Sequence, residues 1–508
     1  MRGAILIAGT HSDAGKSVVT TGICRWLARQ GISVAPFKAQ NMALNSVVAA
    51  DGSEIGRAQA AQAAAAGIGT EAAMNPVLIK PSGHRHSQIV VMGKPYADAD
   101  ARSYQQLKDQ LKPIVADALN DLRSRFDVVV CEGAGSPAEI NLRRADITNM
   151  GLATAHGLPV LVVGDIDRGG VMASLFGTLA LLSQEDQRHI GGFLINKFRG
   201  DASILQPGLD QLQRQTGRAT LGVLPHVEDL WMDVEDSLAL EAPRPEAPAL
   251  KETLDVAVLR LRWMSNFTDV DALATEPGVR VRFTRSAADL ERADLVVIPG
   301  TKATVEDLQR LRDNGLDRVL AQRAQANRPI LGICGGYQLL GTTIDDGVES
   351  RRGRTAGLGL LPVTTQFRAD KLLRRRDGAS AWLGTPVAGY EIRHGRVTRH
   401  GGEPVMANSA DQEPDGCRVG ETYGTSWHGA LEHDGFRRAL LQHVAQRAGR
   451  DFRPGDRAFQ AAREQRLDVL GDLIEQHVDT GKLTDLISGG VPAGLPTVHT
   501  EVRTCSVS

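Results

Sequence analysis

The sequence has few cysteines and almost no net charge, and each shortage excludes a class of protein. Its 508 residues contain five cysteines, which are widely spaced and never form a CxxC pair. This spacing excludes a disulfide scaffold or a zinc ribbon and is typical of a protein in the reducing cytoplasm. Lysine and arginine number 58 against 60 aspartates and glutamates, a formal net charge of −2. Because proteins that coat nucleic acid are normally basic, we expect no nucleic-acid partner.

Long hydrophobic runs are lacking as well. No apolar run approaches the roughly 18 residues that a membrane-spanning helix needs, so we expect no membrane association. The first apolar run, residues 4–8, is interrupted by Gly9, His11 and Asp13 and predicts a buried strand rather than a signal peptide. Hydrophobic residues make up 42% and charged residues 23%, which is ordinary for a soluble globular protein. At roughly 150 residues per domain, the length predicts two or three packed domains.

Short apolar runs alternate with longer helical stretches, which is typical of βαβ units around a mostly parallel sheet. In the first half we expect strands at residues 4–8, 33–37, 127–131, 159–163 and 192–196. After residue 252 the pattern restarts, with expected strands at 254–259, 295–298 and 329–333.

The boundaries follow from composition. Residues 241–252 hold three prolines and almost no large apolar group, so they are predicted to form a surface linker. Beyond residue 450 the chain becomes charged and helical, and its glycine- and proline-containing end is predicted to be a loose tail. The predicted units are therefore residues 1–240, the linker 241–252, residues 253–450, and an extension with a tail at 451–508.

The first expected strand runs directly into GTHSDAGKS and then into a helix-compatible segment. Such a loop turns its N–H groups inward, a lysine neutralises phosphate, and a serine can ligate Mg²⁺. The spacing GxxxxxGKS is one residue longer than the usual form, which argues against a Ras-like switch and resembles the nucleotide loop of dethiobiotin synthetase. The alternative is a plain glycine turn with a chance GKS. The residues expected to bind the nucleotide are Gly9, Thr10, Asp13, Gly15, Lys16 and Ser17.

Polar residues at the ends of other strands support a nucleotide site. Glu132 ends an apolar strand and is expected to contact magnesium with Ser17, although a capping glutamate is the alternative. Asn196 closes a later strand and is expected to read the adenine edge, or else to serve as a turn residue. Asp165 and Asp167 also follow a strand, where solvated loop acids are equally expected.

A cysteine in the second half stands in a nucleophile-elbow context. Cys334 lies between an apolar strand and a helix in GICGGYQ, where a tight turn exposes the side chain and the helix N-terminus favours the thiolate. His428, in GTSWHG, is the expected base. The backbone N–H groups of Gly335 and of the segment near Gly300 are candidate oxyanion donors, and Gln338 is expected to line the pocket or cap the helix.

A patch of amide side chains follows the second expected strand. Lys38 is expected to touch phosphate or carboxylate, or else to be solvated. Three amides follow it, and they would suit a substrate that bears both amides and carboxylates: Gln40, Asn41 and Asn45.

Together these motifs resemble a class I glutamine amidotransferase fused behind a dethiobiotin-synthetase-like ATP domain, an arrangement found in the corrinoid amidases. The matching strings include GTHSDAGKS, FKAQNMALNS, EGAGSPAEINLR, PGTKAT and GTSWHG, and the resemblance covers about residues 3–450. It implies an α/β fold in which a P-loop domain with a mostly parallel sheet precedes an amidotransferase α/β domain and a short helical extension.

The resemblance also implies a reaction. Members of the best-matching branch convert the b, d, e and g carboxylates of adenosylcobyrinic acid a,c-diamide to amides with ATP, Mg²⁺ and L-glutamine, through an acyl phosphate. Carried onto this chain, residues 9–17 would bind ATP, Ser17 and Glu132 would bind magnesium, and Cys334 with His428 would hydrolyse glutamine. The partner would be a small-molecule corrinoid, and assembly with further copies of the chain stays open.

One part of the amidotransferase pattern is missing. Most class I enzymes carry His-x-Glu, but the position two after His428 is Ala430, so a Cys–His dyad is expected and nothing assigns the nearby Glu432 the missing role.

Three other functions compete with the corrinoid prediction. They are an a,c-diamide synthase, a ParA/MinD-like regulatory ATPase, which would have no use for GICGGYQ, and an amidotransferase of cell-wall lipid precursors.

Overall fold

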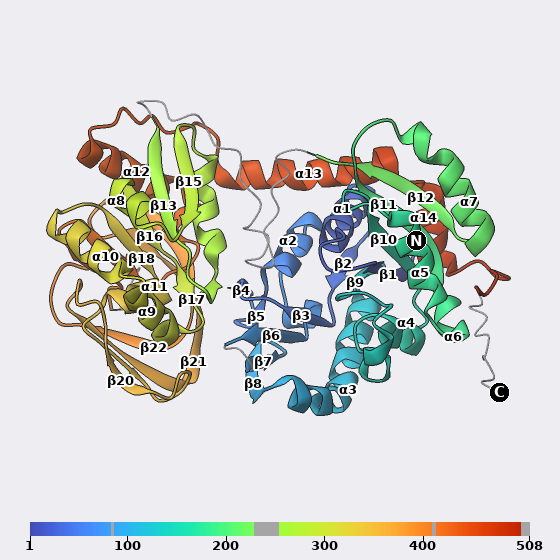
Figure 1. The fold of residues 1–508 in the computed structure, drawn as a ribbon, viewed down its shortest axis with the longest axis horizontal. Helices are drawn as coiled ribbons and strands as arrows, with labels where there is room; N and C mark the ends of the chain where they lie inside the picture. Colours follow the sequence, from blue (N-terminus) through green and yellow to red (C-terminus); the bar gives the residue numbers. More distant parts are fainter. Residues whose placement is uncertain (83–85, 228–252, 409–412, 499–508) are drawn as a thin grey trace, which may run out of the picture.

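The computed structural model describes residues 1–82, 86–227, 253–408 and 413–498, so the predicted linker at 241–252 lies outside the described residues. Two α/β lobes lie side by side and a long C-terminal helix crosses from one to the other (Figure 1). No helix in the described ranges combines the length and apolar character that a bilayer crossing needs.

The first lobe is built on a six-stranded parallel sheet. Its strand order is β12-β11-β10-β1-β9-β2, and the five predicted strands are all present, with boundaries shifted by one or two residues. The strands are β1 (Gly3–Gly9), β2 (Val34–Phe37), β9 (Val128–Glu132), β10 (Val160–Asp165), β11 (Ile190–Phe198) and β12 (Ala219–Pro225).

Helices cover both faces of this sheet, and a smaller sheet of strands β3-β6-β7-β8 with a hairpin, β4-β5, lies beside it. The helices are α1 (Lys16–Arg29), α2 (Arg57–Ala65), α3 (Ala101–Arg125), α4 (Met150–His156), α5 (Val171–Ala180), α6 (Gln184–Gln187) and α7 (Gln206–Thr216). The added strands are β3 (Gln40–Met42), β4 (Ser46–Val48), β5 (Glu54–Gly56), β6 (Val77–Pro81), β7 (Ser87–Val91) and β8 (Lys94–Ala99).

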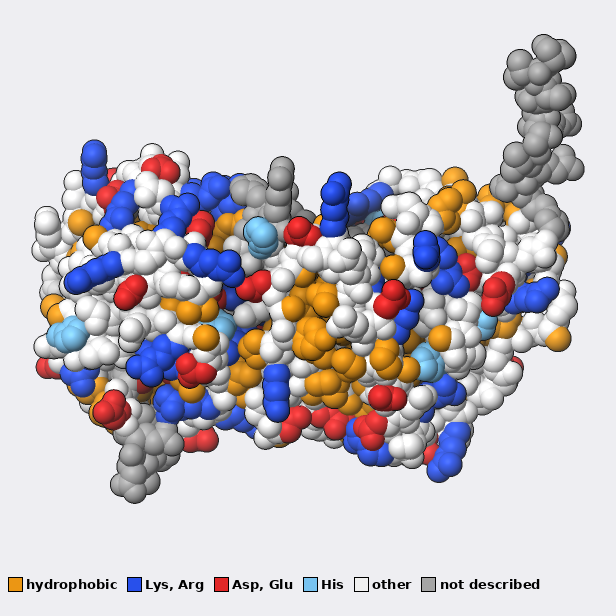
Figure 2. Space-filling model, turned by 90° about the horizontal axis from the view of Figure 1, so that it is seen from below, with side chains coloured by type: hydrophobic (Ala, Val, Ile, Leu, Met, Phe, Trp, Pro, Cys, Tyr) orange, Lys and Arg blue, Asp and Glu red, His pale blue; other side chains and the backbone are white. Residues whose placement is uncertain are grey.

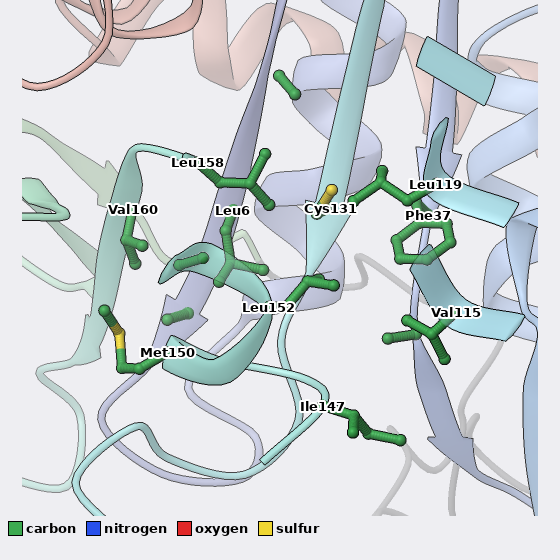
Figure 3. Packing of buried hydrophobic residues seen from close by; sticks show 14 of the residues in the cluster. Leu6, Phe37, Val115, Leu119, Cys131, Ile147, Met150, Leu152, Leu158 and Val160 are labelled. Atoms are coloured by element: carbon green, nitrogen blue, oxygen red, sulfur yellow. The ribbon is translucent and has the colours of Figure 1, made fainter. Parts of the chain in front are cut away.

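Alternation along the central strand fills two cores, because successive side chains of a strand point to opposite faces. Leu6 packs with Cys131 and Leu119 on one face (Figure 3). Ile5 and Ile7 pack on the other face, in a cluster that includes residues of α1 and of the C-terminal extension.

The second lobe repeats the same design with a different order, β15-β13-β16-β18-β25-β24, in which only β24 runs antiparallel. Its strands are β13 (Leu254–Leu259), β15 (Val279–Thr284), β16 (Leu295–Ile298), β18 (Ile330–Ile333), β24 (Cys417–Val419) and β25 (Thr422–Thr425). Its helices are α8 (Ala287–Arg292), α9 (Thr304–Asp313), α10 (Leu316–Gln325), α11 (Gly335–Leu340) and α12 (Asp434–Ala448).

A further sheet and a short pair of strands complete this lobe. The sheet follows the order β20-β19-β21-β22, with β23 pairing β21. Its members are β19 (Thr343–Asp346), β20 (Gly353–Ala356), β21 (Val363–Ser380), β22 (Pro386–Arg399) and β23 (Met406–Asn408), and the short pair is β14 (Met264–Ser265) with β17 (Gly300–Thr301).

The C-terminal extension returns to the first lobe. Helix α13 (Phe459–His477) packs along α1, where Arg25 and Arg29 both bond Asp468, and α14 (Thr480–Gly489) follows it. Glycines make room for this extension: a Cβ on Gly3 would lie 1.8 Å from the Ile487 carbonyl oxygen. The sequence predicted the helices but not the surface that they cover.

The described part of the predicted loose tail also contacts the first lobe. Val498 exchanges two hydrogen bonds with the side chain of Gln187, of 2.8 and 3.1 Å, and the Pro496 carbonyl accepts from Arg218. Residues 490–498 therefore lie along the surface of the first lobe.

Candidate functional site

The phosphate loop joins β1 to α1. Gly15 has φ +103°, and a Cβ there would lie 1.9 Å from Nδ2 of Asn196, so the loop requires glycine at this position. The same Nδ2 donates to the Ala14 carbonyl at 3.1 Å. Asn196 thus supports the loop from beneath, while its predicted contact with adenine stays a prediction.

Lys16 ties the loop to the segment that follows β9. Its Nζ donates to the carbonyls of His11 and Gly135, both at 3.0 Å. Of the other predicted loop residues, Thr10 donates its backbone N–H to Val163, and Asp13 adopts φ +61° at an exposed position. The loop therefore surrounds a buried ammonium at the N-terminus of a helix, which is the arrangement that attracts phosphate.

Glu132 is the buried acid of this site. It accepts hydrogen bonds from Ser17 Oγ at 2.8 Å, from Lys38 Nζ at 2.9 Å, and from Gln62. Burial alone would raise the pKa of Glu132, but the Lys38 ammonium and these three hydrogen bonds keep that pKa below its usual value. The carboxylate is therefore ionised, and a hydroxyl beside a carboxylate is an oxygen donor set that fits Mg²⁺.

The four predicted substrate residues all contact protein groups, and one of them contacts this acid. Lys38 binds Glu132, and Gln40 accepts from the hydroxyl of Tyr104 at 2.5 Å. Asn41 donates to Gln59 Oε1 at 2.9 Å. Asn45 is fully buried, and its backbone carbonyl accepts the N–H that begins α2. Their role toward a substrate stays a prediction.

The remaining strand-end acids of this half behave differently from each other. Asp165 is buried and binds Lys197 Nζ at 2.7 Å, which in turn donates to the Asp13 carbonyl at 2.9 Å. Asp167 is half exposed and contacts Arg199 at 3.2 Å. Asp165 therefore helps to fix the phosphate loop, whereas Asp167 lies at the surface.

Cys334 occupies a strained turn between β18 and α11. Its φ of +51° and ψ of −105° lie outside the conformations that a non-glycine residue ordinarily adopts. Glycines crowd around it: a Cβ on Gly336 would lie 2.0 Å from the Ile298 carbonyl oxygen, and one on Gly335 would lie 2.7 Å from the Thr301 nitrogen. The turn aims the thiol into a small cavity of about 40 Å³.

His428 lies in the same cavity wall and is held by an acid. Its Nδ1 lies 2.7 Å from Oδ2 of Asp269, and the other oxygen of that carboxylate accepts the Gly429 N–H at 2.8 Å. Burial alone would lower the pKa of His428, but Asp269, together with Cys334, raises it from 6.5 to about 10. The buried ring therefore favours the imidazolium form and lies beside the Cys334 sulfur, where it can hand a proton to a leaving group.

The predicted oxyanion residues surround this pair. Gly300 lies opposite the imidazole, since a Cβ there would come within 3.0 Å of Cε1 of His428. Gly335 begins α11 directly after the nucleophile. Gln338 lines the cavity one helical turn further, with Thr304 Oγ1 at 3.5 Å from its Oε1. Gly335 and Gln338 thus line the cavity and Gly300 lies against the imidazole, and the catalytic roles of all three stay predictions.

The acid that holds His428 was missed by the sequence analysis, which expected a dyad. Asp269 lies 159 residues upstream, in the 3-10 segment Phe267–Thr275, and nothing in its spacing points to His428. The available signal was a pair of acids, Asp269 and Asp271, alternating with apolar residues in the segment NFTDVDAL. Glu432 lies elsewhere, bonded to Arg57 of the first lobe.

The cavity around Cys334 opens toward the boundary between the lobes. Its wall includes Lys80 of the first lobe beside Lys371 and Lys302 of the second. Lys80 and Lys371 share one carboxylate, that of Glu54, which is fully buried. The Asn266 side chain accepts the N–H of Ser46 at 2.9 Å. Direct polar contacts thus join the two halves next to the thiol.

Each half of the chain matches a known protein family. Residues 5–239 match the CobQ/CobB/MinD/ParA nucleotide binding domain, and residues 255–436 match the CobB/CobQ-like glutamine amidotransferase domain. The chain is 59% identical to a cobyric acid synthase of Frankia casuarinae, over 98% of this chain and 99% of that one. Proteins of the same name from Streptomyces coelicolor and Rhodococcus jostii are 58% and 54% identical, each over 98% of both chains.

Proposed function

The chain belongs to the cobyric acid synthase family, and on that premise we propose that it amidates the b, d, e and g carboxylates of adenosylcobyrinic acid a,c-diamide, using ATP and glutamine. It is a glutamine-dependent ligase of cobalamin biosynthesis. The observation that supports the proposal most directly is the pairing, in one chain, of a phosphate loop beside Glu132 with a Cys334–His428–Asp269 site whose cavity reaches the first lobe at Lys80.

The first lobe activates the carboxylate, because a free carboxylate is a poor electrophile. Lys16, at the start of α1, is placed to neutralise charge on the γ-phosphoryl group as it passes to the substrate, giving an acyl phosphate. A bound Mg²⁺ would neutralise phosphate charge, and Ser17 and Glu132, which lie within hydrogen-bond distance of each other, would hold it.

The second lobe liberates ammonia. The Cys334 sulfur attacks the side-chain amide of glutamine, and the N–H groups near Gly300 and Gly335 are placed to stabilise the oxyanion. The His428 imidazolium donates its proton to the leaving amine, ammonia departs, and water hydrolyses the glutamyl thioester. Asp269 keeps the imidazole oriented with its Nδ1–H toward the carboxylate.

Ammonia then displaces phosphate from the acyl phosphate and forms the amide. The boundary that it crosses is polar: Ser46 and Glu54 are buried there and are joined by hydrogen bonds to polar groups of the second lobe. The exposed large hydrophobic side chains of the first lobe include Met42, Ile140 and Leu142. Figure 2 shows one face of the molecule on which apolar side chains gather in the middle and charged ones lie around them, an arrangement that would suit a large ring with apolar faces and a polar rim.

The proposal is tested by incubating the protein with ATP, Mg²⁺, glutamine and the a,c-diamide, and following the product by mass spectrometry. We expect four successive mass decrements, one for each hydroxyl replaced by an amino group. Free ammonia should restore amidation to Cys334→Ala but not to Lys16→Ala. A protein that released no ammonia from glutamine and left the corrinoid unchanged would contradict the proposal.

A further inference from the structure

Helix α2 of the first lobe reaches the glutaminase site of the second. At its first residue, Arg57, Nη2 bonds the Glu432 carboxylate and Nη1 lies 3.4 Å from the hydroxyl of Tyr390. The Arg57 side chain is only 3% exposed, so its guanidinium is shielded from solvent at this contact. The Tyr390 hydroxyl also donates to the Ser46 carbonyl at 3.2 Å. One tyrosine of the second lobe is therefore bonded at two points to the first.

Tyr390 in turn holds His428. The two rings stack with centroids 5.6 Å apart and planes 30° from parallel. Their backbones exchange two hydrogen bonds, of 2.8 and 2.9 Å, as an antiparallel bridge between β22 and the histidine turn. Burial keeps the pKa of the Tyr390 hydroxyl well above its usual value, so the group stays a neutral donor. Displacement of Tyr390 would therefore displace the imidazole.

The same helix contacts the activation site further along. Gln62 donates to Glu132, the carboxylate that also accepts from Ser17 and Lys38. Five residues separate Arg57 from Gln62, a rise of about 7.5 Å in an α-helix. Helix α2 thus contacts both sites through buried side chains. Arg57, at its start, bonds Tyr390 and Glu432 on the glutaminase side, and Gln62, about one and a half turns later, bonds Glu132 in the activation site.

We propose that Arg57 is a positioning residue for His428, acting through Tyr390 and Glu432, and that α2 couples occupancy of the phosphate loop to the glutaminase. This rests on the proposed function. A nucleotide on the loop competes for the Ser17 hydroxyl and for the Glu132 carboxylate, and it is this carboxylate that accepts hydrogen bonds from Gln62 and Lys38. A change in the Gln62 bond moves α2, and Arg57 transmits that movement to the tyrosine beside the imidazole.

The test compares ammonia release from glutamine with and without ATP and the a,c-diamide. In Tyr390→Phe the stacked ring stays but the bond to Arg57 and Ser46 is lost, and in Arg57→Met the whole fork is lost. We expect the stimulation by ATP and corrinoid to fall roughly 2- to 30-fold in both variants. The loss should appear in kcat with the KM for glutamine unchanged, because neither residue lines the cavity of Cys334.

Two controls separate this proposal from others. Arg463→Met removes a second cation beside Glu432, at 3.9 Å, and should keep the stimulation. Amidation driven by free ammonia should stay near wild type in Tyr390→Phe, which shows that the first lobe is folded. Unchanged stimulation in both Arg57→Met and Tyr390→Phe would overturn the coupling, as would a wild type that shows none. Absence of any amidation by the wild type would instead overturn the proposed function.

Discussion

At the scale of single residues, the feature with most consequence is the carboxylate behind His428. Replacing Asp269 by Asn keeps the shape but removes the charge that favours the imidazolium. We expect glutaminase kcat to fall by roughly 10²- to 10⁴-fold, as when the acid of a catalytic triad is neutralised. The rate of ammonia release from glutamine measures this. Asp271→Asn, two positions along the same buried segment, is the matched control and should lose far less.

The same pair predicts a pH dependence of stability. Because the pKa of His428 is raised to about 10, its stabilisation is fully present below the unfolded pKa of about 6.5 and is lost as pH rises through about 10. Urea unfolding of the wild type and of Asp269→Asn between these two pH values should show a decline in the wild type and a flatter profile in the variant. Parallel profiles would contradict an imidazolium in the folded state.

Glu132 supplies a second prediction at this scale. In Glu132→Gln the Lys38 ammonium stays buried without its counter-charge, so we expect a loss of about 3–5 kcal/mol in the free energy of unfolding. Amidation should be lost while ammonia release without ATP persists. The double variant Lys38→Met, Glu132→Gln should regain much of the stability but no amidation activity, which separates the fold from the chemistry.

Local features were the ones that sequence alone could predict. The strand, loop and helix around Lys16, and the elbow at Cys334, are contiguous, so their order in the chain nearly determines their geometry. The role of Asp269 could not be predicted, because it lies 159 residues from His428 in sequence and the two meet only once the sheet has assembled. Glu432, near His428 in sequence, bonds a residue of the other lobe.

At the scale of elements, the docking of α13 on α1 is set by shape more than by charge. Gly22 faces α13, and a Cβ there would lie 2.7 Å from the Leu470 carbonyl oxygen. Gly22→Ala should therefore cost about 1–3 kcal/mol, although alanine favours a helix. Asp468→Ala removes bonds from Arg25 and Arg29 at a half-exposed position and should cost only about 0.2–1 kcal/mol.

Urea unfolding of the two variants measures this contrast. If Gly22→Ala were more stable than the wild type, α13 would not pack against α1 as described. The charged, helical character of the chain beyond residue 450 predicted helices, but a pattern of this kind does not specify which surface a helix covers.

At the scale of the whole molecule, Glu54 joins the two lobes. It binds Lys80 of its own lobe and Lys371 of the other, all three being buried. Glu54→Gln leaves two ammonium groups without a counter-charge, so we expect a loss of about 3–5 kcal/mol and unfolding in two separate steps. Asp98→Asn breaks an exposed pair across the same boundary, with Arg351 at 3.7 Å, and should leave a single transition. Calorimetry distinguishes these outcomes.

The return of the last helices to the first sheet also governs the order in which the protein can be made. Leu470, Ile474 and Leu486 complete a core whose other half is laid down with the first strand and helix. A nascent chain therefore leaves the ribosome with one face of its N-terminal half uncovered, and it keeps that face uncovered until residues 470–486 have been synthesised. A chain that terminates before α13 therefore leaves the core of the first lobe exposed, although that lobe was synthesised first and is itself complete in sequence.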